Sequence, residues 1–592
     1  MSGIGGIVGY KTSEDAANLI CGGLVSALSL RGASFSNTYV SEEASLVNTS
    51  SDDVQIVHAA QGDKRYVLVC DGELYNKEEI IKLLDDAGIK FQGLDDATVI
   101  MNGYMAWGAK CLEFFNGVFA FALWDGEKLF MARDRLGLRP LYYTIGAFGL
   151  VFASSIKGLL SHPQVRAVIN AEGAAEVLLI GPGKTPGCGV FKGFCELEPA
   201  NFAVYCEGKI TQTPYWKIKA KPHTENFEET AEIVKAILTD AIKRQSPANK
   251  PIATLLSGGL DSSAVAALSK STESFSVDYV GNDEYFNPSI FQPEGDGKYI
   301  NQMATYLNLN HRHIILDSKA LANTLAEAAA ARGLPGMADV DSSLLLFLKE
   351  VKMESDFAFS GEGADEIFGG YRWYQKDNLL YSNTFPWSQS AEYRYKFLSP
   401  MLAKKINPLE YVNSRFEKTL NEADTLATDD PRENRLRQMY MLNLRWFLQT
   451  LATRNDTMSA AAGVTVRAPF LDYRLVEYLY NVPWQYKNFM GREKGLLRAA
   501  LKGVLPKEVL WRKKSPFPKT HNPAYLTLVR DMLMAMDSNS PIFSLVSKNA
   551  IEMLLNQDSG INWYGQLMAY PQTIAYFLQV NALMKDYSVT IQ

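Results

Sequence analysis

Cysteine is scarce in this 592-residue chain and absent from its C-terminal two-thirds. The six cysteines all lie at or before Cys206, and no two of them form a C-x-x-C pair. This distribution is typical of a reduced protein with scattered buried thiols. We therefore expect a cytoplasmic protein.

An excess of positive charge and a long apolar run are also lacking. The chain has 59 basic and 65 acidic residues and a net charge of -6, whereas binding to nucleic acid favours a basic surface. No apolar run approaches the roughly 20 residues that a membrane-spanning helix needs. The N-terminus has neither the basic nor the apolar region of a signal peptide. We expect neither nucleic acid nor a membrane as a partner.

Length and composition predict a globular protein of two or more domains. The first 200 residues or so contain short runs rich in Val, Phe and Tyr, such as residues 117–134, which predict strands. Beyond about residue 228, strands alternate with helices, as in a parallel sheet, and after about 375 the chain is mostly helical. The stretch that joins the strand-rich first part to the pattern beginning at about residue 228 is polar and aperiodic. The predicted division is a first domain at 1–206, a linker at 207–227 and a second domain at 228–592.

The strongest chemical motif is LLSGGLDSS, residues 255–263. It predicts a strand, a glycine turn and a helix whose free N–H groups bind an anion. Asp261 would repel a phosphate, so we expect a cation between them. A turn with a serine cap is the simpler alternative, but a cap needs less of the pattern. The loop residues placed at a ligand are Ser257, Gly258, Gly259 and Ser262.

This motif resembles the PP-loop of ATP pyrophosphatases, which cleave ATP between the α and β phosphates. Three more segments, at residues 360–371, 464–478 and 491–501, resemble those of asparagine synthetase. The stretches GELYN (72–76) and ARDRLGLRPLYY (132–143) resemble its glutaminase half. The chain is identified as a member of the asparagine synthetase B-like family. That resemblance implies an N-terminal αββα domain of the Ntn type and a C-terminal α/β synthetase domain with a helical end.

The resemblance also implies ATP and Mg²⁺ as cofactors and assigns roles to individual residues. Asp261 and Asp365 would hold Mg²⁺ against the pyrophosphate. Lys494 would stabilise charge on the α-phosphate, and Glu362 would orient the attacking amine and accept its proton. Without the resemblance, Glu362 and Asp365 could be acidic residues of a helix N-terminus, and Lys494 a solvated lysine. The positions that match the adenosine site are Leu255, Val277, Ser360 and Gly361.

The N-terminal half departs from the family pattern at three places. Class II glutamine amidotransferases have a nucleophilic cysteine as the second residue, but here it is Ser2, whose hydroxyl is a poorer nucleophile. Asp71 replaces the oxyanion-hole asparagine, and its carboxylate would repel an oxyanion. No arginine or lysine between Arg31 and Lys64 can clamp the glutamine carboxylate. We interpret this site as vestigial. Its remaining family positions are Gly72, Glu73 and Asp96.

Two other segments are ambiguous. The basic, proline-rich stretch at 511–523 is either a loop near the nucleotide or a solvated loop. We interpret the aromatic-rich stretch at 371–387 as helical packing rather than a platform for a ligand.

Our first hypothesis is an ATP-dependent carboxylate–amine ligase that releases AMP and pyrophosphate. It would adenylate aspartate or an Asp-like side chain, on a small molecule or a peptide, and use free ammonia without hydrolysing glutamine. One alternative is a peptide or secondary-metabolite amide synthetase or cyclase that uses a substrate amine, as lasso-peptide cyclases and β-lactam synthetases do. Others are a glutamine-hydrolysing asparagine synthetase with a Cys-to-Ser substitution and a pseudoenzyme, although the intact synthetase motifs argue against the last. A homodimer stays open.

Overall fold

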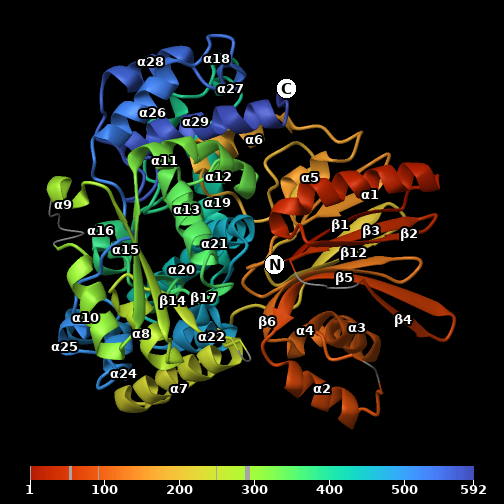
Figure 1. The fold of residues 1–592 in the computed structure, drawn as a ribbon, viewed down its shortest axis with the longest axis horizontal. Coiled ribbons are helices and arrows are strands. Elements are labelled where there is room, and N and C mark those ends of the chain that lie inside the picture. Colours follow the sequence, from red (N-terminus) through yellow and green to blue (C-terminus); the bar gives the residue numbers. More distant parts are fainter. Residues whose placement is uncertain (1, 12, 52–55, 91–92, 248–249, 287–293) are drawn as a thin grey trace.

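The computed structural model describes the chain except residues 1, 12, 52–55, 91–92, 248–249 and 287–293. Two parts lie side by side (Figure 1). One is a stack of antiparallel strands with helices outside it, and the other is a parallel sheet surrounded by many helices.

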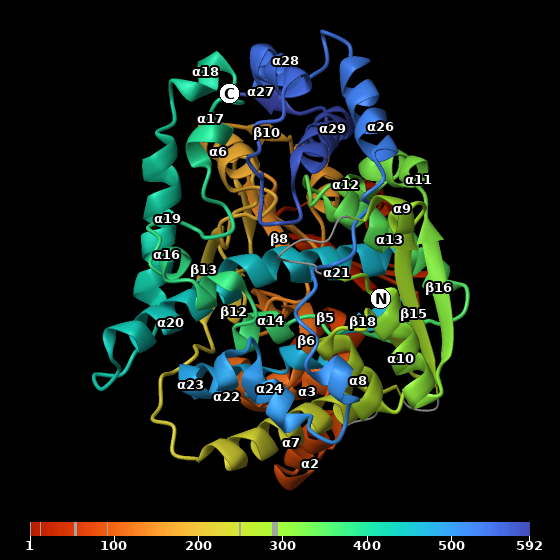
Figure 2. The ribbon, with the colours of Figure 1, turned by 90° about the vertical axis from the view of Figure 1, so that its left-hand side faces the viewer.

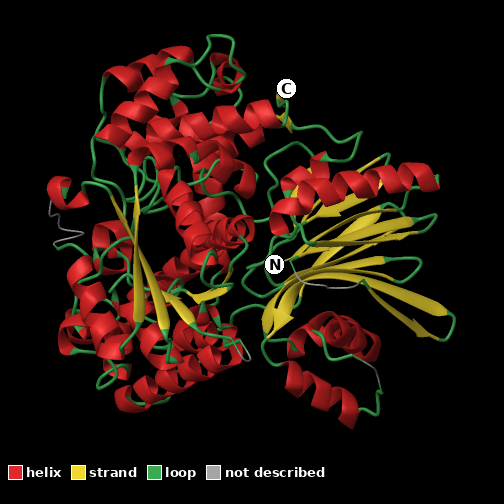
Figure 3. Ribbon diagram, in the orientation of Figure 1, coloured by secondary structure: helices red, strands yellow, loops and turns green. Residues whose placement is uncertain are grey.

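In the first part, two six-stranded antiparallel sheets lie face to face between helices, which confirms the predicted αββα arrangement (Figure 3). Helix α1 (Glu14–Leu28) packs on the first sheet, and α3 (Asp96–Trp107) packs on the second with α2 (Lys77–Asp86) beside it. In spatial order the first sheet consists of β11 (Phe194–Glu196), β8 (Tyr142–Gly146), β9 (Gly149–Ala153), β1 (Ser2–Val8), β3 (Ala44–Ser50) and β2 (Phe35–Val40). The second consists of β13 (Lys209–Pro214), β12 (Asn201–Cys206), β7 (Leu129–Arg133), β6 (Gly117–Trp124), β5 (Lys64–Leu74) and β4 (Val57–Gln61).

The side chains of β6 explain how the layers pack. Successive residues of a strand point to opposite faces. Phe119 and Phe121 pack in the cluster that contains α3, whereas Ala120 and Ala122 pack in the cluster between the two sheets. Both faces of the strand are therefore buried, which is why this segment is apolar throughout rather than alternating with polar residues.

The end of this part differs from the predicted boundary. Strand β13 pairs with β12 over the whole register from Asn201–Pro214 to Cys206–Lys209, so residues 209–214 of the predicted linker belong to the second sheet. Glu207 and Gly208 both have positive φ, at 50° and 76°, which is the conformation of a tight hairpin turn. Residues 215–226 contain no helix or strand and lead to α7 (Phe227–Gln245). The second domain, at 228–592, stays a prediction.

The second part contains a five-stranded parallel sheet, as the alternating pattern predicts. In spatial order its strands are β16 (Asn310–Leu316), β15 (Glu273–Tyr279), β14 (Ala253–Leu255), β17 (Phe357–Phe359) and β18 (Thr465–Arg467). The chain runs outward from β14 through β15 to β16 and then returns to β17 on the other side of β14. Ligands bind at such a switch point, outside the carboxyl ends of the strands.

Helices dominate the rest of the chain. Helices α26 (Ala524–Met534), α28 (Lys548–Asn556) and α29 (Tyr570–Asp586) gather at one end of the molecule (Figure 2). The last strand, β19 (Thr590–Ile591), returns to pair with β10 (Val168–Ile169), which comes from the N-terminal part of the sequence. Among the described helices, none has the length and apolar character needed to cross a membrane.

Candidate active site

The PP-loop connects β14 to α8 (Leu260–Ser269) at the switch point of the parallel sheet. Gly258 has a φ of 64°, and a Cβ there would lie 2.7 Å from the backbone nitrogen of Ile300, so only glycine fits. The Oγ atoms of Ser257 and Ser262 lie 3.0 Å apart. The N-cap residue of α8, Gly259, provides no side-chain cap. The first N–H groups of the helix therefore stay available to an anion, which disfavours the simple serine-cap alternative.

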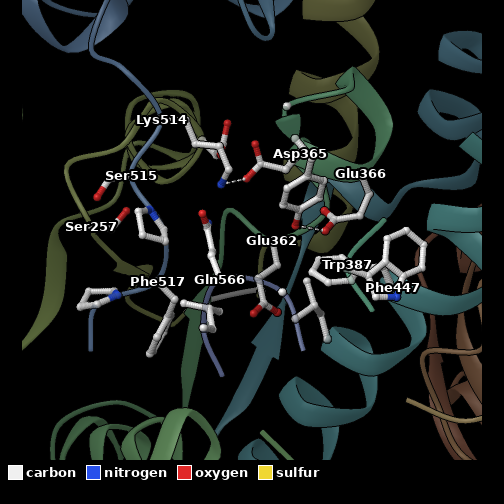
Figure 4. Close-up of a pocket in the computed structure, with 18 of the residues that line it drawn as sticks. Ser257, Glu362, Asp365, Glu366, Trp387, Phe447, Lys514, Ser515, Phe517 and Gln566 are labelled. Carbon is white, nitrogen blue, oxygen red and sulfur yellow. Dashed lines mark hydrogen bonds and ion pairs between the residues drawn. The ribbon is translucent and has the colours of Figure 1, made fainter. Parts of the chain in front are cut away.

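Two carboxylates and two lysines meet beside this loop. Lys494 lies before α24 (Gly495–Ala500), and its Nζ is 2.7 Å from an oxygen of Asp261 and 2.8 Å from Asp365 Oδ1. Lys514 donates to the other oxygen of Asp365 at 2.7 Å, as Figure 4 shows. Lys494 is 2% exposed, so it is not the solvated lysine of the alternative interpretation. We call these four residues the acid–lysine cluster.

Burial and neighbouring charge act in opposite directions in the acid–lysine cluster. At Asp261 burial dominates and raises the pKa, although Lys494 opposes the rise. Burial opposes ionisation of Asp365, but the ammonium groups of Lys494 and Lys514 outweigh it and hold the pKa of Asp365 well below its ordinary value. Burial likewise disfavours charge on Lys494, but Asp261 and Asp365 outweigh it and raise its pKa above the ordinary value. The two carboxylates thus converge on one cation.

This arrangement also fits a magnesium ion. Mg²⁺ is commonly bound by one or two carboxylates together with water and substrate phosphates. Gly361 allows the two carboxylate-bearing loops to approach, because a Cβ there would lie 2.6 Å from the backbone nitrogen of Ser262. Among the described residues, no group of three or more His, Cys, Asp and Glu side chains forms a fuller metal cage.

Glu362 lines a large cavity, where it lies between the PP-loop and a group of aromatic side chains (Figure 4). It forms an ion pair with Arg454 of α21 (Leu448–Ala462), and its backbone N–H donates to Ser360 Oγ at 3.2 Å. The Arg454 side chain is 3% exposed, and its Nε and Nη1 have no hydrogen-bond partner among the described residues. Both atoms are buried, and the Arg454 guanidinium lies over the ring of Phe517, 5.1 Å from its centroid.

One cavity of about 880 Å³ brings most of the predicted synthetase residues together. Lys494 does not line it but contacts two residues that do, and Gly258 and Gly259 belong to the PP-loop without lining the cavity. The predicted residues in the cavity wall are Leu255, Ser257, Asp261, Ser262, Val277, Ser360, Gly361, Glu362 and Asp365.

Two segments that were ambiguous in the sequence lie at this cavity. Residues 513–518 of the basic loop line it, and Arg512 donates to the carbonyl oxygen of Ser257 at 3.2 Å. Of the two interpretations of this loop, the structure therefore supports the one near the nucleotide site. The interpretation of residues 371–387 as packing alone was incomplete, because Tyr371, Trp373 and Trp387 pack together and also line the cavity.

The site around Ser2 is arranged differently. Ser2 is 9% exposed, and its Oγ donates to Ser50 Oγ at 3.2 Å. Asp71 accepts from Arg31 Nη2 at 2.7 Å and lies 3.5 Å from Arg139 Nε. The expected unpaired carboxylate is therefore neutralised by two arginines.

The same two arginines reach into the second part of the molecule. Asp456 of α21 accepts from Arg31 Nη1 at 2.6 Å and from Arg139 Nη1 at 2.7 Å. We call Arg31, Asp71, Arg139 and Asp456 the interdomain ion cluster. A narrow cavity of about 50 Å³ between the two parts is lined by Arg139, Asp456 and Glu362. Ser2 is not among the described residues that line this cavity or the large one.

The other predicted glutaminase positions, Gly72, Glu73 and Asp96, take part in contacts within the protein. Glu73 forms an ion pair with Arg467 of β18. Asp96 begins α3, and its Oδ1 accepts from the backbone N–H of Leu74 at 3.1 Å. Gly72 is tightly packed, since a Cβ there would lie 2.6 Å from the carbonyl oxygen of Val118.

A PP-loop site behind an Ntn-type domain defines an ATP-dependent amide ligase with an amidotransferase-like N-terminal half. Comparison with known proteins agrees: residues 234–585 match the asparagine synthase family, and residues 1–216 match the glutamine amidotransferase domain. The chain belongs to the asparagine synthase family.

Several curated proteins are similar over most of the chain. Asparagine synthetase [glutamine-hydrolyzing] 3 of Bacillus subtilis is 38% identical over 614 aligned residues, which cover 100% of both chains. Asparagine synthetase [glutamine-hydrolyzing] 1 of the same organism is 26% identical and covers 77% of this chain and 76% of its own. Amidase chry2 of Gibberella zeae is 26% identical and covers 80% of this chain and 79% of its own.

Proposed function

We propose that the protein activates a carboxylate with ATP and Mg²⁺ and joins it to free ammonia without hydrolysing glutamine. The observation that carries this proposal is the acid–lysine cluster beside the PP-loop, in one cavity with Glu362. Aspartate or an Asp-like side chain is the carboxylate that the family suggests first.

The proposed chemistry has two steps. In the first, a carboxylate oxygen attacks the α-phosphorus of ATP, an acyl-adenylate forms and pyrophosphate leaves. The PP-loop N–H groups and serine hydroxyls hold the phosphates, while Lys494 stabilises the charge that develops at the α-phosphate. In the second, ammonia attacks the acyl carbon, Glu362 accepts a proton and AMP leaves. Asp261 and Asp365 would hold Mg²⁺, which neutralises phosphate charge when it is bound.

The N-terminal half supports the use of free ammonia. Ser2 carries a hydroxyl in place of a thiol, is nearly buried and lines neither cavity. Asp71 is held by Arg31 and Arg139, so the position that should donate to an oxyanion holds an acceptor in an ion pair. Because asparagine synthetase 3 of Bacillus subtilis, which aligns over 100% of both chains, is named as glutamine-hydrolyzing, glutamine hydrolysis is the first alternative. Attack by a substrate amine is the second.

The proposal is tested by AMP formation from ATP, ammonium and a panel of carboxylic acids that includes aspartate. Asp365→Asn should reduce AMP formation strongly, because it removes a carboxylate from both Lys494 and Lys514. The matched control is Asp377→Asn, whose carboxylate is 70% exposed, pairs with Arg432 and does not line the cavity. AMP formation by Asp365→Asn at the rate of this control would show that the site assignment is wrong.

A further inference from the structure

Glu362, the proposed base of the second step, has one carboxylate oxygen in use and one left over. Arg454 of α21 donates from Nη2 to Glu362 Oε1, whereas Oε2 has no hydrogen-bond partner among the described residues. The Glu362 side chain is 23% exposed and lies at the cavity between the PP-loop and Trp387 (Figure 4). Oε2 is therefore the oxygen that is left to accept a proton.

Arg454 itself has little freedom to move. Its side chain is 3% exposed, and its guanidinium lies over the ring of Phe517, 5.1 Å from the centroid. Two residues further along α21, Asp456 forms ion pairs with Arg31 and Arg139 of the N-terminal half. The helix is thus anchored close to Arg454, and the carboxylate oxygen that Arg454 holds is fixed with it.

This arrangement costs free energy in the folded protein. Nε and Nη1 of Arg454 are buried without a partner among the described residues, and buried donors that lack an acceptor are destabilising. Arg133 is a useful comparison, because its side chain is 1% exposed and all three of its guanidinium nitrogens donate to backbone carbonyl oxygens. Stability alone therefore does not explain a buried arginine whose side chain has a single polar contact, with the proposed base.

The contact with Glu362 does suit the chemistry of a base. A base must lie within hydrogen-bond reach of the proton that it accepts. An arginine side chain can only donate hydrogen bonds, so Arg454 occupies Oε1 and leaves Oε2 as the acceptor. Such orientation matters for the rate, because a misplacement of about 1 Å can cost about 10²-fold.

We infer that Arg454 is a positioning residue for the amide-forming step, in which it holds Glu362 so that Oε2 can accept the proton of the attacking amine. This inference rests on the proposed function and adds one residue to it. Among the described residues, the Arg454 side chain forms no hydrogen bond or ion pair with the PP-loop or the acid–lysine cluster, which serve the first step. Its loss should therefore separate the two steps.

The test uses Arg454→Met, which removes the donors and keeps an unbranched, flexible side chain. ATP–pyrophosphate exchange with an accepted carboxylate, without ammonium, measures the first step, and AMP release with ammonium measures both. Exchange should keep its rate and its KM for the carboxylate, whereas AMP release should fall by about 10²-fold. The thermal midpoint should not fall, because the variant also removes two buried donors without a described partner.

Two further variants complete the test. The matched control is Arg332→Met, because the Arg332 side chain is 4% exposed but pairs with Asp341 and does not line the large cavity. It should lower the midpoint and leave the ratio of AMP release to exchange unchanged. Arg454→Lys keeps a charged donor but not the planar fork, so it should recover part of the lost AMP release. If Arg454→Met does not fold, Arg454→Lys should still lower AMP release more than exchange.

The outcomes separate this inference from the proposed function. AMP release by Arg454→Met at the wild-type rate would overturn the inference. Exchange that falls as much as AMP release would also overturn it and would place Arg454 in substrate binding instead. Both results leave the proposed function intact. No exchange by the wild type with any acid of the panel would overturn the proposed function, and the inference with it.

Discussion

The two halves of the molecule both contain buried carboxylates paired with basic side chains, but in different settings. In the acid–lysine cluster, the side chains of Asp261 and Asp365 are 19% and 15% exposed and face a cavity of about 880 Å³. In the interdomain ion cluster, those of Asp71 and Asp456 are 2% and 3% exposed. Charges at a cavity wall can exchange partners with a ligand, whereas sealed charges hold the structure in one arrangement.

The interdomain ion cluster is thus sealed, whereas the acid–lysine cluster faces a cavity. Two arginines from the N-terminal half are neutralised by one carboxylate from each half. Removing the carboxylate partner of a buried arginine strongly destabilises the folded protein, because it leaves a buried charge unpaired. The cluster therefore connects the region around Asp71 to α21, the helix that also supplies Arg454 to Glu362.

The largest expected effect is at the acid–lysine cluster. Lys494→Met should lower AMP formation by about 10²–10³-fold, the usual effect of removing one group that stabilises transition-state charge. AMP release from ATP with an accepted carboxylate and ammonium measures it. Lys502→Met, an exposed lysine shortly after the same helix, is the control and should keep the wild-type rate. Near wild-type adenylation by Lys494→Met would show that the acid–lysine cluster does not take part in the reaction. It would then not differ in function from the interdomain ion cluster.

The second expected effect is on stability. Asp456→Asn should destabilise the protein by about 3 kcal/mol, because Arg31 and Arg139 then share only Asp71. The thermal midpoint measures this, with Asp356→Asn as the control, since its carboxylate is 63% exposed and its ion pair contributes little. A midpoint for Asp456→Asn equal to that of the control would show that the sealed cluster has no structural role.

The same variant has a pH signature. Burial opposes ionisation of Asp456, but Arg31 and Arg139 outweigh it and lower its pKa. A group with a lowered folded-state pKa stabilises the protein above its unfolded-state pKa, about 4 for aspartate, and loses that contribution as the pH falls. The difference in midpoint between wild type and Asp456→Asn should therefore shrink as the pH falls below about 4.

Local patterns in the sequence were sufficient for much of the fold and for the nucleotide loop. The strand, turn and helix at residues 255–263 could be predicted because each of these elements depends on residues that are neighbours in the sequence. The hairpin at Glu207 and Gly208 was missed, because this pair is a weaker turn signal than Asn-Gly or Asp-Gly.

The ion pairs were beyond local inference. Arg31 and Asp456 are 425 residues apart, and Lys514 meets Asp365 across 149 residues. A charged residue within a helix is usually solvated, so no local pattern distinguishes Arg454 or Asp456 from surface charges. The family resemblance supplied Lys494 and Glu362, but it supplied none of the partners that neutralise Asp71.

The smallest expected effect is at Ser2, where restoring the nucleophile should change almost nothing. Ser2→Cys returns a thiol, yet Asp71, at the position where we predict the oxyanion donor, is still bound to Arg31 and Arg139. The loss of one oxyanion donor alone costs about 10²–10³ in rate. Glutamate release from glutamine by wild type and by Ser2→Cys should both stay near background, while synthesis with ammonium proceeds. The Ser2→Cys/Asp71→Asn double variant sharpens the comparison by also restoring the amide. Robust glutamate release by the wild type would show that Ser2 is a working nucleophile, and robust release by Ser2→Cys alone would show that the rest of the glutaminase site is intact.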